Sequence, residues 1–326
     1  MPLLPAIHSI EQYRASPRDE ATYAPAIDAV CERHGIADQP RTKYAGGSTI
    51  VFAIGDAYVV KLFEPIFAAN FATELEVLRR VEGALDVPTP RVVASGELDG
   101  WSYLVMTQLH GRLASDAWPT LSPEGRRAVC EQVGAATARL HALPVDGREL
   151  PPAPWPRFLD AQRQQCVEHQ RAKGLDEHWL AQIPAFLASV QLPAEGGSLL
   201  HTEIMREHVL LGGTDGSPDG LHAPVLTGIF DFEPAMVGHP EYDFASVGVF
   251  LTGGDPRLFG AFLHGYGRPP ASLRGLPERV MAYALLHRYS NVRWYLETVP
   301  PRTARTFGAL AQEWFGADRP SPEQRF

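Results

Sequence analysis

The chain has 326 residues, of which 45% are hydrophobic and 21% charged, and its formal net charge is −9. These values are typical of a soluble globular protein with one large domain or two lobes. The acidic balance argues against nucleic-acid binding, which needs a basic face, and suits a small cationic substrate. Three scattered cysteines indicate neither a disulfide framework nor a structural zinc site. Without a signal peptide or an apolar run of roughly 20 residues, we expect a cytoplasmic protein with no membrane partner.

The first third of the chain is rich in predicted strands. Runs of β-branched residues on both sides of Gly55-Asp56 predict a hairpin, because glycine takes positive φ at no steric cost. The predicted elements, in chain order, are a helix at residues 23–34, strands at 49–54 and 57–63, a helix at 67–81, and strands at 91–94 and 102–107.

After Gly111 the pattern becomes mostly helical. Ser122 followed by Pro123 predicts a helix start, because serine caps helices and proline suits the first turn. The predicted helices cover residues 123–141, 157–170, 177–190, 241–252 and 274–298, with short strands within 199–211 and 225–230 and an exposed turn at 212–224. We therefore expect an α+β fold with a small β-rich lobe, residues 1–107, and a larger helical lobe, residues 108–326.

Two features of the first lobe suggest phosphate binding. Gly46-Gly47-Ser48 precedes a strand, and exposed backbone N–H groups there could cradle phosphate oxygens, although a plain turn has the same pattern. Lys61 lies within an apolar strand, which is unusual because an unpaired buried ammonium is costly. Glu74, on the following helix, is placed to pair with it. The alternative is a lysine on an edge strand that points to solvent.

Two charged clusters follow apolar runs in the second half. His201-x-Glu203 with His208 is typical of a polar loop or of a transition-metal site. Asp231-Phe-Glu233 follows a predicted strand, and a carboxylate at a strand end is a good ligand for Mg²⁺, a helix cap being the alternative. Together the clusters indicate a site for metal and phosphate.

The order of these motifs is that of a kinase. In detail the chain resembles the aminoglycoside phosphotransferase family, which has a protein-kinase-like fold. The resemblance covers roughly residues 40–250. It rests on stretches that begin at Gly46 (GGSTIVF), Val59 (VVKLF), Thr73 (TELEVLRR), Val87 (VPTPRV), Tyr103 (YLVM), Ala138 (ARLHALP) and Gly228 (GIFDF).

The resemblance implies a nucleotide site. Lys61 would hold the α- and β-phosphates of ATP or GTP, oriented by Glu74. Backbone N–H groups near Gly47 and Ser48 would cover the phosphates. The hinge that reads the purine edge would comprise Met106, Gln108 and Leu109.

The resemblance also implies catalytic and metal roles. Asp231 would bind Mg²⁺. Glu203 stands where the family has a catalytic aspartate and would accept the substrate hydroxyl proton, but its oxygen is shifted by about 1 Å, enough to cost roughly 10²-fold in rate if nothing else adjusts. His208 stands where the family has a metal-binding asparagine. Because Mg²⁺ prefers oxygen ligands, this change predicts weaker Mg²⁺ binding or one metal ion fewer.

The expected reaction transfers the γ-phosphate of a nucleoside triphosphate to a hydroxyl of a cationic, aminoglycoside-like substrate, and so modifies an antibiotic. Two alternatives remain: a kinase of an endogenous hydroxylated metabolite, and a non-catalytic nucleotide- or ligand-binding pseudokinase, which Glu203 and His208 favour.

Several side chains are candidates for contact with this substrate. Tyr289, Trp294 and Tyr295 could form a substrate wall, although core packing is favoured, and Asp243 is expected to brace a neighbouring loop. The candidate substrate carboxylates are Glu207, Glu233, Glu241, Asp255, Glu297 and the C-terminus of Phe326.

Overall fold

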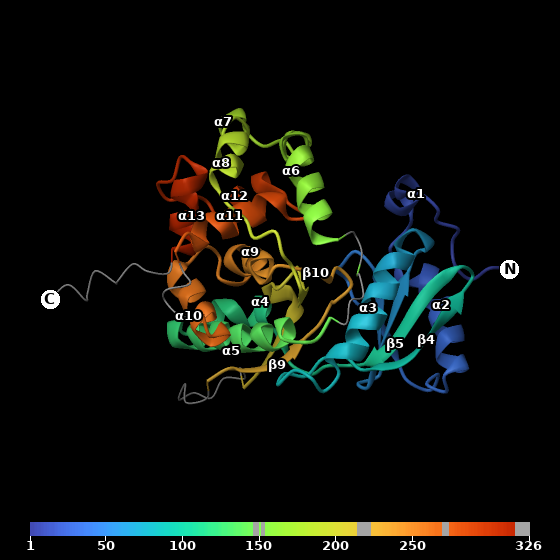
Figure 1. Ribbon diagram of the computed structural model, residues 1–326. Coiled ribbons are helices and arrows are strands. Elements are labelled where there is room, and N and C mark those ends of the chain that lie inside the picture. The colour runs from blue at the N-terminus through green and yellow to red at the C-terminus, as the bar shows by residue number, and fades with distance from the viewer. Residues whose placement is uncertain (146–149, 151–153, 214–222, 269–273, 317–326) are drawn as a thin grey trace. The chain divides into compact units, whose positions relative to one another are not determined.

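The computed structural model describes residues 1–145, 150, 154–213, 223–268 and 274–316 (Figure 1). The chain forms two compact units. Unit 1 comprises Met1–Gly83, Pro88–His110 and Ile229–Pro234, and unit 2 comprises Ala84–Val87, Gly111–Gly228 and Ala235–Phe326. Most of the predicted turn at 212–224, and the C-terminus of Phe326, lie outside the described residues. Among the described residues, no helix is both long and apolar enough to cross a bilayer.

Unit 1 is built on an antiparallel sheet whose strands lie in the order β1-β2-β3-β5-β4. The strands are β1 (Arg41–Lys43), β2 (Ile50–Ile54), β3 (Tyr58–Phe63), β4 (Val92–Leu98) and β5 (Trp101–Thr107). The predicted hairpin is the β2–β3 pair. Because β3 lies between β2 and β5, Lys61 is on a central strand, and the edge-strand alternative is wrong.

Helices cover both faces of this sheet (Figure 1). They are α1 (Ile10–Ala15), α2 (Glu20–Arg33), η1 (Pro65–Phe67) and α3 (Ala68–Val81). Val60 and Leu62 point into a core shared with the buried face of α2. Since side chains alternate along a strand, Lys61 and Phe63 point to the opposite face, where Phe63 meets Phe71 of α3 with ring centroids 5.6 Å apart. The alternation of side chains along β3 thus places the ammonium of Lys61 on the side of the sheet covered by α3, which carries Glu74.

Unit 2 is mostly helical. Its short strands form two small sheets, β7 (Ser198–Leu200) with β10 (Met236–Gly238), and β6 (Arg112–Leu113), β8 (Val209–Gly212) and β9 (Val225–Ile229). The helices are α4 (Ala114–Ala117), η2 (Trp118–Thr120), α5 (Pro123–His141), α6 (Trp155–Ala172), α7 (Glu177–Leu180), α8 (Ile183–Ser189), η3 (Arg206–His208), η4 (Pro240–Tyr242), α9 (Asp243–Ser246), η5 (Val247–Leu251), α10 (Pro256–Tyr266), α11 (Leu276–Leu286), α12 (Val292–Thr298) and α13 (Phe307–Phe315).

Helices α5 and α10 of unit 2 pack closely, and glycines make the approach possible. A Cβ on Gly134 would lie 2.1 Å from the carbonyl oxygen of Phe262, and one on Gly265 would lie 1.9 Å from that of Glu131. Both contacts are with backbone, which cannot rotate away. Ser122 caps α5 by accepting a hydrogen bond from the N–H of Gly125, as predicted.

Three helical predictions differ from the structure. Residues 177–190 form two short helices, α7 and α8, in place of one. Residues 241–252 form a 3₁₀ turn, a short α-helix and the π-helical η5 in place of one helix. Residues 274–298 split into α11 and α12, because the backbone of His287 is extended and Ser290 bonds back to the carbonyl oxygen of Ala284. Helices α10 and α13 were not predicted. The predicted α+β fold, with an antiparallel sheet followed by a helical region, is confirmed.

Candidate active site

Lys61 lies at the centre of a cluster of carboxylates within unit 1. Its Nζ is 2.7 Å from Asp231 Oδ1, 2.8 Å from Glu74 Oε2 and 2.9 Å from Glu233 Oε2. The lysine and Glu74 are nearly inaccessible, whereas Asp231 retains 27% of its side-chain exposure. The predicted pairing of Lys61 with Glu74 is present, and Asp231 joins it because the segment after β9 belongs to unit 1.

The electrostatics of the cluster are those of a buried site with excess negative charge. Burial alone would lower the pKa of Lys61, but attraction to Asp231, Glu74 and Glu233 outweighs it and holds the pKa well above its usual range. Burial raises the pKa of Glu74 to about 7, because the attraction of Lys61 opposes the cost of desolvation without cancelling it. Burial also raises the pKa of the neighbouring Glu64 to about 7. One ammonium therefore faces more carboxylates than it can neutralise.

The donor set of this cluster fits a hard divalent cation. Oxygens of Glu74, Asp231 and Glu233 lie within 4.8 Å of one another. The buried Oε2 atoms of Glu74 and Glu233 contact the ammonium but accept no hydrogen bond of good geometry from the residues the structure describes. Carboxylate oxygens are the ligands that Mg²⁺ prefers. Asp231 and Glu233 are therefore suitable Mg²⁺ ligands.

The backbone of Asp231 is strained. Its φ is 71°, in the left-handed region that side chains other than those of Asn and Asp rarely adopt. The following residue, Phe232, is fully buried and anchors the turn. Such strain persists only where surrounding packing enforces it, and it is concentrated at functional sites.

The glycine-rich turn before β2 is held by α1 and by the segment between α1 and α2. Gly47 has a φ of 96°, which favours glycine, and a Cβ there would meet no atom within 4 Å. The carbonyl oxygen of Ser48 accepts hydrogen bonds from Tyr13 Oη at 2.7 Å and from Arg18 Nη1 at 2.8 Å. This tether fixes the orientation of the peptide group between Ser48 and Thr49.

The predicted hinge residues lie at the end of β5. Met106 is 5% exposed and pairs across the sheet with Val59. The N–H of Gln108 donates to the carbonyl oxygen of Ala57 at 2.8 Å, so it is already occupied. Leu109 follows and is half-buried. A purine edge would therefore be read by groups of the connector other than the Gln108 N–H.

The loop between β7 and β8 in unit 2 carries Glu203 and His208, and Asp243 braces it, as predicted. Asp243 is fully buried and accepts hydrogen bonds from the N–H of His201 at 2.9 Å and of Thr202 at 2.7 Å. It also contacts His141 Nε2 at 2.9 Å. Thr202 has a φ of 72°, which is disfavoured for a β-branched residue, so these bonds stabilise a strained backbone.

Further side chains contact the backbone of this loop at Thr202, Glu203 and Ile204. His287 Nε2 lies 3.0 Å from the carbonyl oxygen of Thr202, and Ser246 Oγ accepts from the N–H of Ile204 at 3.1 Å. His208 Nδ1 lies 2.8 Å from the carbonyl oxygen of Glu203. Burial lowers the pKa of His287 to about 4, so this histidine is neutral near pH 7 and donates from Nε2. The loop is thus rigid while the side chain of Glu203 is half-buried.

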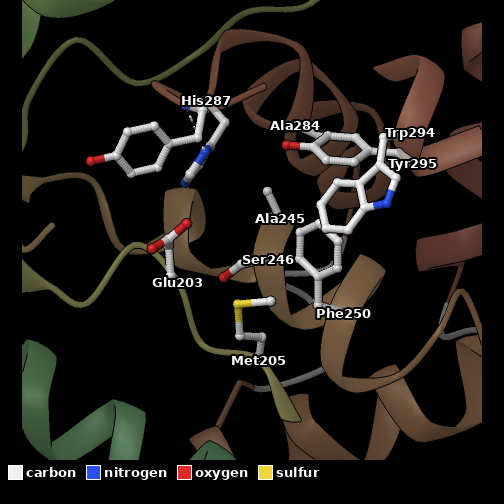
Figure 2. A pocket seen from close by; sticks show the side chains of 10 residues that line it. Glu203, Met205, Ala245, Ser246, Phe250, Ala284, His287, Trp294 and Tyr295 are labelled. Atoms are coloured by element: carbon white, nitrogen blue, oxygen red, sulfur yellow. Dashed lines mark hydrogen bonds between the residues drawn. The ribbon is translucent and has the colours of Figure 1, made fainter. Parts of the chain in front are cut away.

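Glu203 lines a pocket of unit 2. Figure 2 shows its carboxylate on the side of His287, with the rings of Trp294 and Phe250 across the pocket. Tyr295 is buried, as expected for core packing, but Trp294 is 44% exposed and Tyr289 is 45% exposed. The packing interpretation is therefore wrong for these last two aromatic residues, which line the pocket instead.

The carboxylates proposed for a cationic substrate have different surroundings. Glu233 forms an ion pair with the ammonium of Lys61. Glu241 is buried and bound by Arg279 at 2.7 Å and 2.9 Å. Glu297 is exposed and pairs with Arg293 at 2.8 Å. Asp255 caps α10 through the N–H of Arg257, and Glu207 is exposed in η3. Each of these groups except Glu207 has a hydrogen-bond or ion-pair partner given above among the residues that the structure describes.

Sequence reasoning missed several residues that support the site. His141 lies within the ARLHALP stretch, so a signal was present, yet its contact with Asp243 spans 102 residues. His287, Tyr13 and Arg18 belong to no motif and were identified only by the folded structure.

Comparison with known proteins identifies the family of this chain. The profile of the phosphotransferase enzyme family matches residues 42–276. Viomycin phosphotransferase from Streptomyces vinaceus is 28% identical over 185 residues, which cover 53% of this chain and 60% of that enzyme. The chain thus aligns with about three-fifths of the length of this relative.

Solved structures show the same fold. A GDP complex of an aminoglycoside 2′-phosphotransferase-IIIa mutant has a TM-score of 0.64 at 17% identity, covering 90% of this chain and 97% of the other. The apoenzyme of macrolide 2′-phosphotransferase MphH from Brachybacterium faecium has a TM-score of 0.59 at 20% identity, covering 89% and 97%. The chain belongs to the phosphotransferase enzyme family, and its fold is the protein-kinase-like fold of the aminoglycoside phosphotransferases.

Proposed function

We propose that the protein is a small-molecule kinase that transfers the γ-phosphate of ATP or GTP to a hydroxyl group. The observation that carries this proposal is the buried ammonium of Lys61, held by Glu74, Asp231 and Glu233 in unit 1. Such a cluster combines one fixed cation for phosphate with surplus carboxylates for a metal ion. Family membership supports the same reaction class.

Several residues of unit 1 have specific roles in this proposal. Lys61 would bind the α- and β-phosphates, and Glu74 would keep its side chain in place. Peptide groups near Gly47 and Ser48 would cover the phosphates, and the connector from Met106 to Leu109 would contact the purine. Asp231, assisted by Glu233, would hold Mg²⁺. When bound, Mg²⁺ neutralises charge on the β- and γ-phosphates.

The loop of unit 2 that carries Glu203 would accept the proton of the acceptor hydroxyl. The acceptor oxygen attacks the γ-phosphorus, the bond from that phosphorus to the β–γ bridging oxygen breaks, and the nucleoside diphosphate leaves. The hydroxyl proton passes to the carboxylate of Glu203. The hydrogen bonds that link the loop to Asp243, Ser246 and His287 would keep it in place during this step.

The acceptor is proposed by class. Aminoglycosides, macrolides and viomycin are the first compounds to test, since the similar proteins are phosphotransferases named for them. An endogenous hydroxylated metabolite is the alternative acceptor. A second function, nucleotide binding without turnover, is favoured by Glu203 and His208, which replace an aspartate and an asparagine expected in the family.

His208 also predicts a metal preference. An imidazole nitrogen in place of an amide oxygen favours Mn²⁺ over Mg²⁺ relative to an all-oxygen site. The ratio of Mn²⁺- to Mg²⁺-supported turnover should therefore fall in His208→Asn. An unchanged ratio would remove His208 from the metal site.

The test of the proposed function compares two aspartates with positive φ. Asp231→Asn removes the charge while keeping a residue that tolerates the left-handed conformation. We expect ADP or GDP release to fall roughly a hundredfold or more, which corresponds to about 3 kcal/mol. Asp99→Asn, at a φ of 50° in the turn between β4 and β5, is the matched control and should keep full turnover.

Binding and turnover are measured separately in this test. A thermal-shift titration with ATP and GTP, with and without Mg²⁺, reports nucleotide binding by the native protein. Nucleotide binding without turnover on any acceptor supports the non-catalytic alternative. Full turnover in Asp231→Asn would overturn the proposed role of Asp231.

A further inference from the structure

The pocket beside Glu203 has a lining that differs from what a polycationic acceptor requires. It has a volume of about 90 Å³, enough for several water molecules or a group of several carbon atoms. Its lining residues are Glu203, Met205, Ala245, Ser246, Phe250, Ala284, His287, Tyr289, Trp294 and Tyr295. Glu203 is the one acidic side chain among these ten, and His287 is neutral near pH 7.

The polar groups on the pocket floor are already used within the protein. Ser246 Oγ accepts from the N–H of Ile204 and donates to the carbonyl oxygen of Asp243. His287 bonds to the carbonyl oxygen of Thr202 through Nε2 and to the N–H of Tyr289 through Nδ1. These side chains therefore add shape but little hydrogen-bonding capacity for a ligand.

The walls of the pocket are aromatic and partly open to solvent. The rings of Phe250 and Trp294 lie 4.9 Å apart, and Phe250 also meets Tyr295 at 5.4 Å (Figure 2). The small side chains of Ala245 and Ala284 leave room beneath these rings. A half-exposed tryptophan beside a cavity offers a large apolar surface whose burial by a ligand is favourable.

This chemistry distinguishes between acceptor classes. Several ammonium groups would each need a carboxylate, and one placed against the aromatic wall without a partner would lose hydration. A single ammonium could lie between the carboxylate of Glu203 and the face of Trp294. An apolar alkyl or ring portion matches the rest of the lining.

We propose that this pocket binds the acceptor, and that the acceptor is a hydroxylated molecule with an apolar alkyl or ring portion and at most one positive charge. The inference rests on the proposed kinase function and specifies its substrate class. Aminoglycosides with several amines would then be poor acceptors for this member of the family.

The experiment measures acceptor binding without nucleotide, by calorimetry. The probes are erythromycin, which carries one amine on a largely apolar frame, and kanamycin, which carries several amines. The native protein should bind erythromycin more tightly. Trp294→Ala should weaken erythromycin binding roughly tenfold or more while changing kanamycin binding less than about twofold. Trp294→Phe, which keeps an aromatic ring, should restore most of the affinity.

A charge substitution gives a second comparison. Trp294→Glu should abolish erythromycin binding and strengthen kanamycin binding, because it adds a carboxylate at the pocket. Val225→Glu is the matched control, since Val225 is 56% exposed, belongs to β9 and does not line the pocket. It should change neither affinity. Melting temperatures of all variants show whether a loss of binding reflects unfolding.

The outcomes separate the two proposals. Tighter binding of kanamycin by the native protein, or equal erythromycin affinity in the native protein and a folded Trp294→Ala, overturns the acceptor class. Turnover of kanamycin that is insensitive to Trp294 would also overturn it, while the kinase function stood. The expected binding pattern without nucleotide turnover would support the pocket and reject the kinase function.

Discussion

Replacement of Asp243 by asparagine tests whether one buried carboxylate stabilises the Glu203 loop. The carboxylate accepts from two backbone N–H groups, at 2.9 Å and 2.7 Å, and contacts His141 Nε2 at 2.9 Å. The side-chain oxygen of an asparagine can still accept the hydrogen bond from the N–H of Thr202. The NH₂ group of the asparagine then faces the N–H of His201, and because both groups are donors, no hydrogen bond forms between them. His141 can adapt by presenting an unprotonated Nε2.

The change in the free energy of unfolding follows from the hydrogen bonds that the substitution keeps and loses. A buried N–H without a partner costs about 1–3 kcal/mol, and the bond from Thr202 loses about 1 kcal/mol when its acceptor becomes neutral. Removal of a buried charge offsets part of this loss. We therefore expect Asp243→Asn to lower the free energy of unfolding by about 1–3 kcal/mol.

Urea unfolding at pH 7, followed by circular dichroism, measures this change. The control is Asp19→Asn, because Asp19 is an exposed helix cap that accepts from the N–H of Thr22 and asparagine caps equally well. Acceptor turnover should also fall in Asp243→Asn, since the strained Thr202 would no longer be held. A loss below about 0.5 kcal/mol, within the range of ordinary surface changes, would refute the reasoning.

Two further predictions concern the helical unit. The pKa of His287 is lowered from 6.5 to about 4, so the unfolded chain binds more protons between these pH values and stability falls as the pH drops through them. The stability difference between the native protein and His287→Asn should therefore shrink by about 3 kcal/mol from pH 7 to pH 4, and a constant difference in urea titrations would contradict this. Gly134→Ala should destabilise by about 1–3 kcal/mol in the same titrations, because its Cβ would lie 2.1 Å from the carbonyl oxygen of Phe262. Gly308→Ala in α13, where a Cβ meets nothing within 4 Å, should instead be neutral or stabilising, and equal effects of the two changes would count against close packing of α5 on α10.

Local patterns in the sequence were sufficient for several elements of the fold. The Gly55-Asp56 turn between β-branched runs predicted the β2–β3 hairpin, and Ser122-Pro123 predicted the start of α5. Asp255-Pro256 has the same form and begins α10, yet this helix was not predicted. Asp255 was instead interpreted as a carboxylate for substrate.

Other features could not be read from local patterns. The break between α11 and α12 depends on His287, whose hydrogen bond to Thr202 spans 85 residues. The open position of Trp294 depends on neighbours from several elements. Periodicity indicates that a residue is apolar, but whether it is covered depends on packing between elements distant in the chain.

The sequence by itself placed Lys61 within an apolar strand, where a buried ammonium would need an acidic partner, but it left open whether this strand lay at the edge of the sheet. It also indicated Glu74, because the strand and the following helix are adjacent and their side-chain periods are regular. Only the tertiary structure decided that Asp231 and Glu233, 170 and more residues away, share that ammonium, and that Asp243 holds the Glu203 loop. The physical reason is that local propensities set the element and the face of a residue, whereas its electrostatic partners are chosen when distant elements pack together.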